Sequence, residues 1–246
     1  TAENAGFEAL FMRTMRDREL VMEAQETMTG NRVQFDYVCI GGVNKDVNAE
    51  IEKTIKTKLS ELKKMMDEIR ALFENNWSLS LKYKGVGVIT KKSALRCSVL
   101  GPLARASGVD FDVRNNSDYL PYSELGFRSI TQEGGDIHAR NMVRILEIYE
   151  SMRLIESALD GMPEGDISTK VRGTPEGESY MRVEAPRGEC FYYVKGSKAQ
   201  YLDRVRIKTP TFGSVPAMIE ALTGQNYADV PAIVASFDPC LSCTAR

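Results

Sequence analysis

The feature that most constrains the fold is a row of apolar residues in the segment 48–73. They recur three or four residues apart, the spacing of one face of an α-helix, at Ile51, Ile55, Leu59, Leu62, Met66, Ile69 and Phe73. Asn48 stands just before the first of them and is a favourable N-cap residue. We therefore expect one long helix whose apolar face belongs to the core.

Two other segments have helical patterns. Residues 3–28 are rich in Met, Glu, Arg and Leu, contain no proline and are followed by Gly30. Residues 136–159 repeat the apolar spacing, at Ile145, Ile148, Met152, Ile155 and Leu159. We expect this stripe to pack against another long helix.

The remaining chain contains shorter elements. Residues 34–40 are expected to be extended, and segments 179–185 and 190–195 alternate around Pro186-Arg187-Gly188-Glu189, which indicates a hairpin. Segment 201–209 is expected to add a strand, segments 214–222 and 227–236 short helices, and segment 161–177 a surface excursion. The predicted fold class is α+β and helix-dominated, a long-helix bundle with a small β-hairpin or sheet region. We expect one continuous unit, with residues 1–160 as bundle and glycine-rich loops, and residues 161–246 as hairpin region and C-terminal metal-binding segment.

Composition excludes several classes of function. The 246 residues carry a net charge of −2, so the basic excess of a nucleic-acid binder is absent. The single histidine, His138, excludes metal sites that need several imidazoles, and we expect it to be a helix-surface or hydrogen-bonded residue. Five cysteines, an odd number, favour reduced cytosolic thiols. The glycine-rich segments lack a dinucleotide fingerprint or a P-loop. No apolar run is long enough to span a membrane.

The sharpest chemical signal is the pair Cys240 and Cys243. Two intervening residues bring both sulfurs to one point, which suits a soft metal or a redox disulfide, whereas two small buried apolar side chains are the structural alternative. Tetrahedral zinc needs four donors, and Cys39, Cys97 and Cys190 show no paired spacing, so we expect those three to be buried apolar thiols.

The tail Ser236-Phe237-Asp238-Pro239-Cys240-Leu241-Ser242-Cys243-Thr244-Ala245-Arg246 resembles the C-terminus of nickel-iron hydrogenase large subunits, and its ending resembles the membrane-bound, energy-converting branch. Four more motifs agree in order, at residues 41–46, 101–108, 135–140 and 184–189. Segment 101–108 is similar to the loop shared with the 49 kDa subunit of respiratory complex I.

This resemblance implies residue roles. Cys240 would be a terminal nickel ligand and Cys243 would bridge nickel and iron, with CO and CN ligands on the iron. Arg187 would lie over the open metal face, Pro186 would line the pocket of the diatomic ligands, and Asp238 would anchor Arg187 or the cysteine loop. The activity would be reversible oxidation of H2. Implied partners are an iron–sulfur small subunit, membrane subunits and ferredoxin as electron carrier, which would place the protein in the cytoplasm on the inner face of the membrane.

One departure qualifies the resemblance. The family's second Cys-x-x-Cys, near its N-terminus, is absent, so we expect a segment that begins after that motif, in line with its start at Thr1. The chain alone is then expected to be inactive, with its tail mobile or held by an incidental ion such as zinc. Two alternatives remain open: a quinone-pocket subunit of the complex I 49 kDa type, and a non-enzymatic zinc-binding interaction module.

Overall fold

The computed structural model describes residues 3–245. Thr1, Ala2 and Arg246, the last residue of the tail motif, lie outside the described residues. The helices are η1 Glu3–Ala5, α1 Glu8–Thr29, α2 Ala49–Asn75, α3 Trp77–Tyr83, α4 Lys91–Arg96, α5 Pro102–Arg105, α6 Val113–Asn116, α7 Ile137–Asp160, α8 Pro210–Leu222, η2 Tyr227–Asp229, α9 Val230–Phe237 and α10 Leu241–Thr244. The strands are β1 Val38–Cys39, β2 Gly42–Val43, β3 Glu176–Ala185, β4 Gly188–Ser197 and β5 Arg204–Lys208.

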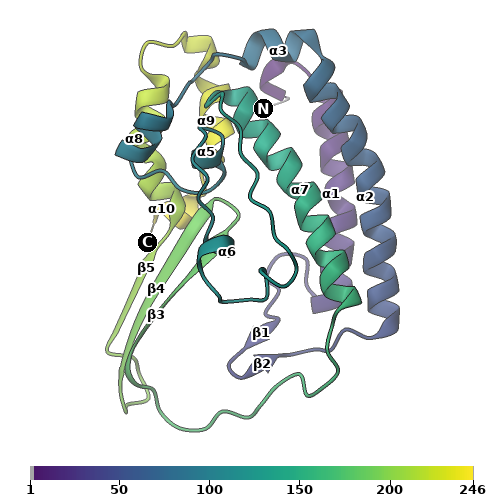
Figure 1. Ribbon diagram of the computed structural model, residues 1–246, viewed down its shortest axis with the longest axis vertical. Helices are drawn as coiled ribbons and strands as arrows, with labels where there is room; N and C mark the ends of the chain where they lie inside the picture. The colour runs from purple at the N-terminus through teal and green to yellow at the C-terminus, as the bar shows by residue number, and fades with distance from the viewer. Residues whose placement is uncertain (1–2, 246) are drawn as a thin grey trace.

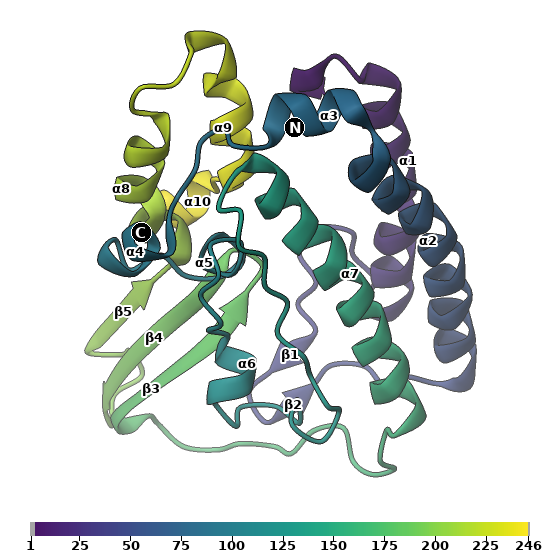
Figure 2. The ribbon, with the colours of Figure 1, turned by 45° about the horizontal axis from the view of Figure 1, so that its top comes forward.

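The three long helices α1, α2 and α7 lie side by side and form one half of the molecule (Figure 1). The antiparallel sheet β3-β4-β5 forms the other half, with α8, α9 and α10 beside the end where β3 and β4 meet (Figure 2). The helix-dominated α+β class predicted from the sequence is confirmed.

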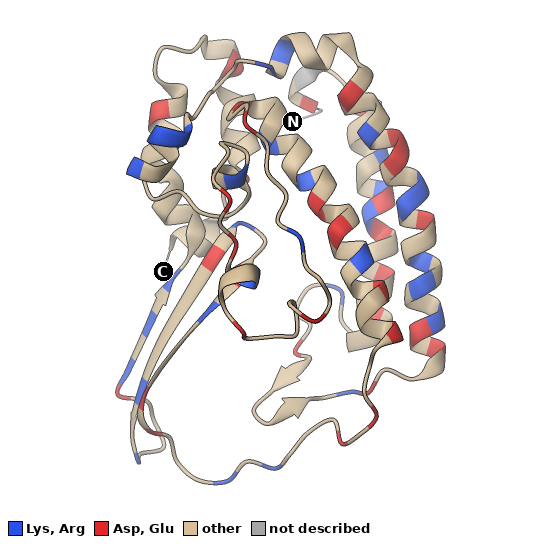
Figure 3. Cartoon of the chain, in the orientation of Figure 1, with Lys and Arg blue, Asp and Glu red and all other residues tan. Residues whose placement is uncertain are grey.

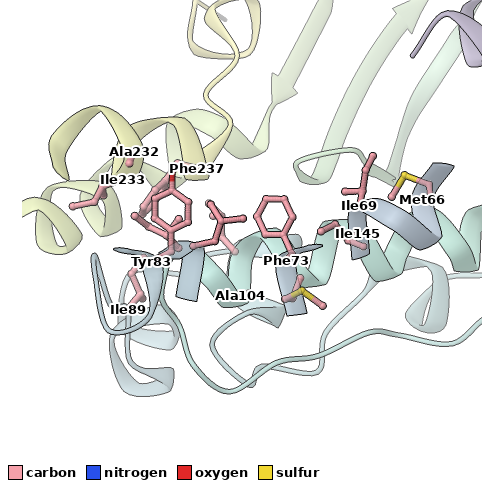
Figure 4. Close-up of a cluster of buried hydrophobic side chains, with 14 of the residues drawn as sticks. Met66, Ile69, Phe73, Tyr83, Ile89, Ala104, Ile145, Ala232, Ile233 and Phe237 are labelled. Carbon is pink, nitrogen blue, oxygen red and sulfur yellow. The ribbon is translucent and has the colours of Figure 1, made fainter. Parts of the chain in front are cut away.

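Helix α2 begins and buries its face as predicted. The Asn48 side chain accepts a hydrogen bond from the backbone N–H of Ile51 at 2.9 Å. All seven residues of the predicted stripe are buried, each with less than a tenth of its surface exposed. Their side chains continue into one core cluster that includes Tyr83, Ile89, Ile233 and Phe237 (Figure 4). The core thus joins the bundle to the C-terminal helices across the predicted boundary at residue 160.

Two helical expectations need correction. The first helix begins at Glu8 rather than Glu3, because Gly6 has a φ of +84° and separates a short 3₁₀ turn from α1. On α7, Ile145 and Met152 are buried, but Ile148 and Ile155 are 37% and 42% exposed. The reason is that both line an apolar groove beside α1 and α2 that no described residue fills.

The predicted cysteine environments are also wrong in part. Cys39, Cys97 and Cys190 are half-buried rather than buried. Cys97 packs against the core, yet its thiol lies 3.8 Å from a carboxylate oxygen of Glu220. His138 is half-buried, with Nε2 at 3.3 Å from the backbone oxygen of Phe73. This contact agrees with the prediction of a hydrogen-bonded helix residue.

The hairpin lies where the alternating pattern predicts it, but Gly188 and Glu189, which were expected in the turn, already belong to β4. β3 pairs with β4 from Glu176↔Ser197 to Ala185↔Gly188, so Pro186 and Arg187 alone form the turn. β5 extends the sheet along the other edge of β4. The excursion at residues 161–175 is exposed throughout and touches the Gly41-Gly42 turn through a bridge between Ser168 and Gly42.

The surface carries both signs of charge. Lysines, arginines, aspartates and glutamates alternate along α1, α2 and α7, and the blue positions on the sheet are interspersed with red ones (Figure 3). Within residues 3–245, no helix combines the length and the apolar character needed to cross a membrane.

Candidate functional site

The turn between β3 and β4 carries Arg187 to the C-terminal helices. Proline at the first turn position restricts φ, which favours a tight reversal. The turn lies directly against Gly101: a Cβ on that residue would be 2.5 Å from the Arg187 oxygen and 2.4 Å from the Gly188 Cα. Gly101 also has a φ of +70°, which disfavours other residues. The close approach of these two backbones fixes the position of the Arg187 backbone, from which its side chain extends.

The end of α9 carries Asp238 to the same place. Asp238 has φ 54° and ψ 54°, a left-handed conformation that aspartate tolerates better than most residues. Its N–H donates to the Ala235 oxygen at 3.1 Å, which terminates the helix and turns the chain toward Pro239 and Cys240. The start of α8 supports the next residues: the Cys240 N–H donates to Thr211 Oγ1 at 3.4 Å, and Thr209 Oγ1 donates to the Cys243 oxygen.

Arg187 and Asp238 meet through two contacts. Nε of Arg187 donates to the backbone oxygen of Asp238 at 2.6 Å, and Nη2 donates to the carboxylate Oδ1 at 3.1 Å. Both side chains remain partly exposed, at 30% and 45%. An ion pair of this exposure contributes about 1 kcal/mol or less to stability, so the pair matters more for geometry than for folding.

The two thiols lie together beside Arg187. Cys240 Sγ is 3.0 Å from Ser242 Oγ, and Cys243 lies close enough to influence the Cys240 thiol. The Ser242 hydroxyl, then the Cys243 backbone and thiol, and the Arg187 charge lower the pKa of Cys240 to about 7. Burial, followed by the neighbouring Cys240, raises the pKa of Cys243. Deprotonation of the pair therefore starts at Cys240.

A mostly apolar cavity of about 210 Å³ lies beside Arg187, between the start of α8 and the tail. It is lined by Leu103, Arg187, Thr211, Ser214, Val215, Met218, Phe237, Pro239 and Thr244. Pro186 is not among these residues, so its place beside diatomic ligands stays a prediction. Arg187 and several apolar side chains therefore line the same small cavity.

The side chains available as ligands determine which metal ions could bind at this site. Two adjacent thiols are soft ligands of the kind that nickel, copper(I) and iron–sulfur sites use. Within residues 3–245, however, no group of three or more His, Cys, Asp or Glu side chains is placed to hold a metal ion. Among the described residues, Cys240 and Cys243 therefore offer two soft donors, and a metal ion held there would need further ligands.

The structure brings together four of the predicted site residues, Arg187, Asp238, Cys240 and Cys243. It also shows a buried ionic cluster that sequence reasoning missed. Arg105 is 1% exposed and pairs with Asp112 at 2.9 Å, Glu147 at 2.7 Å and Glu184 at 2.9 Å. Glu184 stands three residues before Arg187, so this cluster anchors the strand that leads into the turn.

One signal could have revealed the cluster. Arg105 stands in the short apolar segment Leu103–Ala106, where an arginine is costly unless it is paired. Asp112 stands just before α6, whereas Glu147 lies on α7 and Glu184 on β3, far from Arg105 in the sequence. The sequence therefore shows that Arg105 needs carboxylates but not which ones.

Comparisons with known proteins identify a family and several relatives. The family described as the 49 Kd subunit of respiratory-chain NADH dehydrogenase matches residues 4–174 and 168–246. The carbon monoxide-induced hydrogenase of Rhodospirillum rubrum is 35% identical over 100% of this chain and 68% of its own length. The membrane-bound hydrogenase subunit alpha of Pyrococcus furiosus is 35% identical over 98% of this chain and 60% of its own.

A third relative belongs to the quinone-linked branch. An NADH-quinone oxidoreductase subunit of Dehalococcoides mccartyi is 34% identical over 91% of this chain and 62% of its own length. The chain thus spans between 60% and 68% of the length of these three relatives. With a family match along nearly all of its length and relatives above 30% identity, the chain belongs to the family of the 49 Kd subunit of respiratory-chain NADH dehydrogenase, which includes hydrogenase subunits.

Proposed function

We propose that this chain is the catalytic large subunit of a nickel-iron hydrogenase of the energy-converting, membrane-associated type. Its reaction is the reversible oxidation of H2 to protons and electrons. The observation that carries the proposal is the convergence of two thiols, Cys240 and Cys243, beside the Arg187–Asp238 pair. The similarity to two hydrogenase subunits supports the same conclusion.

The residues of the chain have distinct roles in this proposal. Cys240 and Cys243 hold the metals, and a bound nickel–iron pair with CO and CN ligands would supply the electron acceptor for H2 splitting. The thiolate of Cys240 takes the proton that leaves H2. Arg187 directs its guanidinium toward the cavity and polarises the gas. Asp238 holds that guanidinium in one orientation through its carbonyl and carboxylate oxygens.

The partners follow from this assignment. Electrons leave to an iron–sulfur small subunit and then to ferredoxin, and membrane subunits anchor the complex to the inner face of the cell membrane. The name of one relative, a membrane-bound hydrogenase subunit, supports the membrane association. The chain itself acts from the cytoplasm in this arrangement.

A second candidate function has its own support. The matching family is described by the 49 Kd subunit of NADH dehydrogenase, and one relative is an NADH-quinone oxidoreductase subunit. A quinone-pocket subunit needs no metal thiolates, so paired thiols beside a guanidinium favour the hydrogenase. The zinc-binding interaction module, with the cysteine pair as half of an intermolecular clasp, is the third candidate.

Metal and activity measurements on the intact complex test the proposal. We expect nickel and iron, infrared bands of bound CO and CN, and hydrogen turnover. Quinone reduction without nickel would identify the second candidate, and stoichiometric zinc without nickel would identify the third. Cys240→Ser and Cys243→Ser should each abolish hydrogen turnover, because a hydroxyl is a hard and poor ligand for nickel.

A matched control separates ligand loss from misfolding. Cys97→Ser changes a half-buried thiol that contacts Glu220 rather than the cysteine pair, and it should leave turnover within about two-fold of wild type. Circular dichroism should show an unchanged helix content in all three variants, because the apolar stripe of α2 lies in a different part of the chain. Hydrogen turnover that survives in either Cys240→Ser or Cys243→Ser would refute the metal assignment.

A further inference from the structure

Arg140, in the first turn of α7, is among the largest fully buried side chains, with 1% of its surface exposed. Its Nη1 donates to the backbone oxygen of Gly87 at 2.9 Å and to that of Gly135 at 2.7 Å. Its Nε donates to Ser236 Oγ at 2.9 Å. The Arg140 side chain thus connects the loops that contain Gly87 and Gly135 to the end of α9.

None of these three acceptors is a carboxylate. A buried guanidinium without a paired carboxylate is costly, because desolvation is compensated only by hydrogen bonds. Burial and the neighbouring Arg144 lower the pKa of Arg140 to about 9, so the side chain still carries its charge at neutral pH. The fold therefore retains a buried cation whose hydrogen bonds at these three positions all go to neutral oxygens.

The packing around Arg140 leaves little freedom. A Cβ on Gly87 would lie 3.2 Å from Arg140 Nη2 and 2.9 Å from a side-chain carbon of Ile233. On the α9 side, the guanidinium carbon lies 4.9 Å from the centre of the Phe237 ring, a cation–π distance. Ser236 accepts from Arg140 while its own hydroxyl donates to the Ile233 oxygen at 2.6 Å, so its hydroxyl is fixed from both sides.

Asp238 follows these two residues directly. Ser236 and Phe237 are the last residues of α9 to be buried, and the next residue adopts the left-handed conformation that aims its oxygen at Arg187 Nε. A shift at Ser236 or Phe237 would pass along the backbone to that oxygen, because at most one residue intervenes. The three acceptors of Arg140 lie outside the cluster of Arg187, Cys240 and Cys243.

We propose that Arg140 is a positioning residue that fixes the C-terminal end of α9, so that the carbonyl oxygen of Asp238 meets Nε of Arg187. It acts on the site through Ser236 and Phe237 rather than by contact. The effect of this positioning on H2 chemistry rests on the proposed function. The coupling between Arg140 and Arg187 does not, because it depends only on contacts within the chain.

Hydrogen exchange of guanidinium N–H groups, measured by NMR on the full chain, tests the coupling without any metal. The Arg187 Nε–H signal is assigned from its loss in Arg187→Lys. Ser236→Ala removes one acceptor of Arg140, and Arg140→Lys removes the planar fork that reaches three oxygens. In both variants we expect the Arg187 Nε–H to exchange at least about ten-fold faster than in wild type.

The Nε–H of Arg105, which donates to Glu147 at 2.7 Å, serves as an internal reference, and its rate should stay within about two-fold. Arg70→Lys, on the exposed surface of α2, is the matched arginine control and should change neither rate. An unchanged Arg187 rate in Ser236→Ala and Arg140→Lys would overturn the proposal. Equal acceleration at Arg105 and Arg187 would also overturn it, because Arg140 would then be a general stabiliser.

This readout is independent of the proposed function. A complex that holds no nickel and oxidises no H2 would refute the hydrogenase assignment and leave the measured coupling intact. An unchanged Arg187 exchange rate in Ser236→Ala and Arg140→Lys, with nickel and hydrogen turnover found in the intact complex, would refute the positioning role and leave the hydrogenase assignment intact.

Discussion

Arg187 reaches Asp238 twice, from Nε to its backbone oxygen at 2.6 Å and from Nη2 to its carboxylate at 3.1 Å. The two residues are far apart in the sequence, one in a hairpin turn and the other at the end of a helix. Because the shorter contact uses the backbone, the orientation of Arg187 depends on how the chain turns at position 238 and not only on the identity of that side chain.

Arg187→Lys should lower hydrogen turnover of the intact complex by at least about ten-fold with nickel content unchanged. Lysine keeps the charge but cannot contact the carbonyl and the carboxylate of Asp238 together in the geometry of a planar fork. Arg182→Lys, at a half-buried position of β3 where the guanidinium pairs with Glu189, is the control and should keep wild-type turnover. Turnover within a few-fold of wild type in Arg187→Lys would reduce Arg187 to a turn residue.

Gly101→Ala should displace the hairpin turn, because the new Cβ would lie 2.4 Å from the Gly188 Cα and 2.5 Å from the Arg187 oxygen. Gly30→Ala is the comparison, since Gly30 also has a positive φ but has open space around it. Gly30→Ala should cost about 1 kcal/mol of unfolding free energy and Gly101→Ala at least about 2 kcal/mol more. Urea denaturation measures both, and equal losses would show that the turn can move away.

Ile145→Ala and Ile148→Ala should differ although both positions belong to one apolar stripe of the sequence. Ile145 is 7% exposed and Ile148 is 37% exposed. Burial makes the first substitution cost about 2–5 kcal/mol and the second about 1 kcal/mol or less. Equal destabilisation in chemical denaturation would indicate that Ile148 is covered in the folded protein.

The stability of the protein should depend on Glu184 in a defined direction of pH. Burial is the largest effect and raises the pKa of this carboxyl above its ordinary value of 4.5, against the opposing charge of Arg105. Between 4.5 and the folded-state pKa, the folded chain holds a proton that the unfolded chain has lost. The contribution of Glu184 therefore decreases as pH rises through this window.

Glu184→Gln supplies the comparison, because the amide does not titrate while Asp112 and Glu147 remain in both proteins. The unfolding free energy of wild type minus that of Glu184→Gln should fall as the pH is raised from 4.5 toward neutrality. Denaturant titrations at several pH values measure this difference. A difference that grows with pH would mean that the ion pair with Arg105 outweighs burial.

The local elements of the fold follow from the sequence because their causes are local. The spacing from Ile51 to Phe73 and the N-cap at Asn48 predict α2 nearly residue by residue. Alternation on both sides of Pro186-Arg187 likewise predicts the hairpin, since a turn with a proline and a glycine can close over few residues. The resemblance of the tail and hairpin motifs to nickel-iron hydrogenase large subunits implies that Asp238, Cys240 and Cys243 share one site with Arg187.

The expectations of side-chain burial were wrong at positions where neighbours from other parts of the chain determine the exposure. The stripe on α7 is helical as predicted, but only packing against α2 determines that Ile145 is covered and Ile148 is not. The half-burial of Cys39, Cys97 and Cys190 depends in the same way on neighbours from other parts of the chain.

The sequence by itself determined the three long helices and the hairpin, because hydrogen-bond periodicity, capping and turn preferences act over a few residues. The short helices α3, α4, α5, α6 and α10 were not predicted. Only the tertiary structure decided how the site is supported. Arg105 finds Asp112 just before α6, Glu147 on α7 and Glu184 on β3. Arg140 joins the loops of Gly87 and Gly135 to the end of α9. Buried cations must find oxygen partners wherever the fold supplies them, so those partners are set by the packing of distant segments rather than by residue spacing.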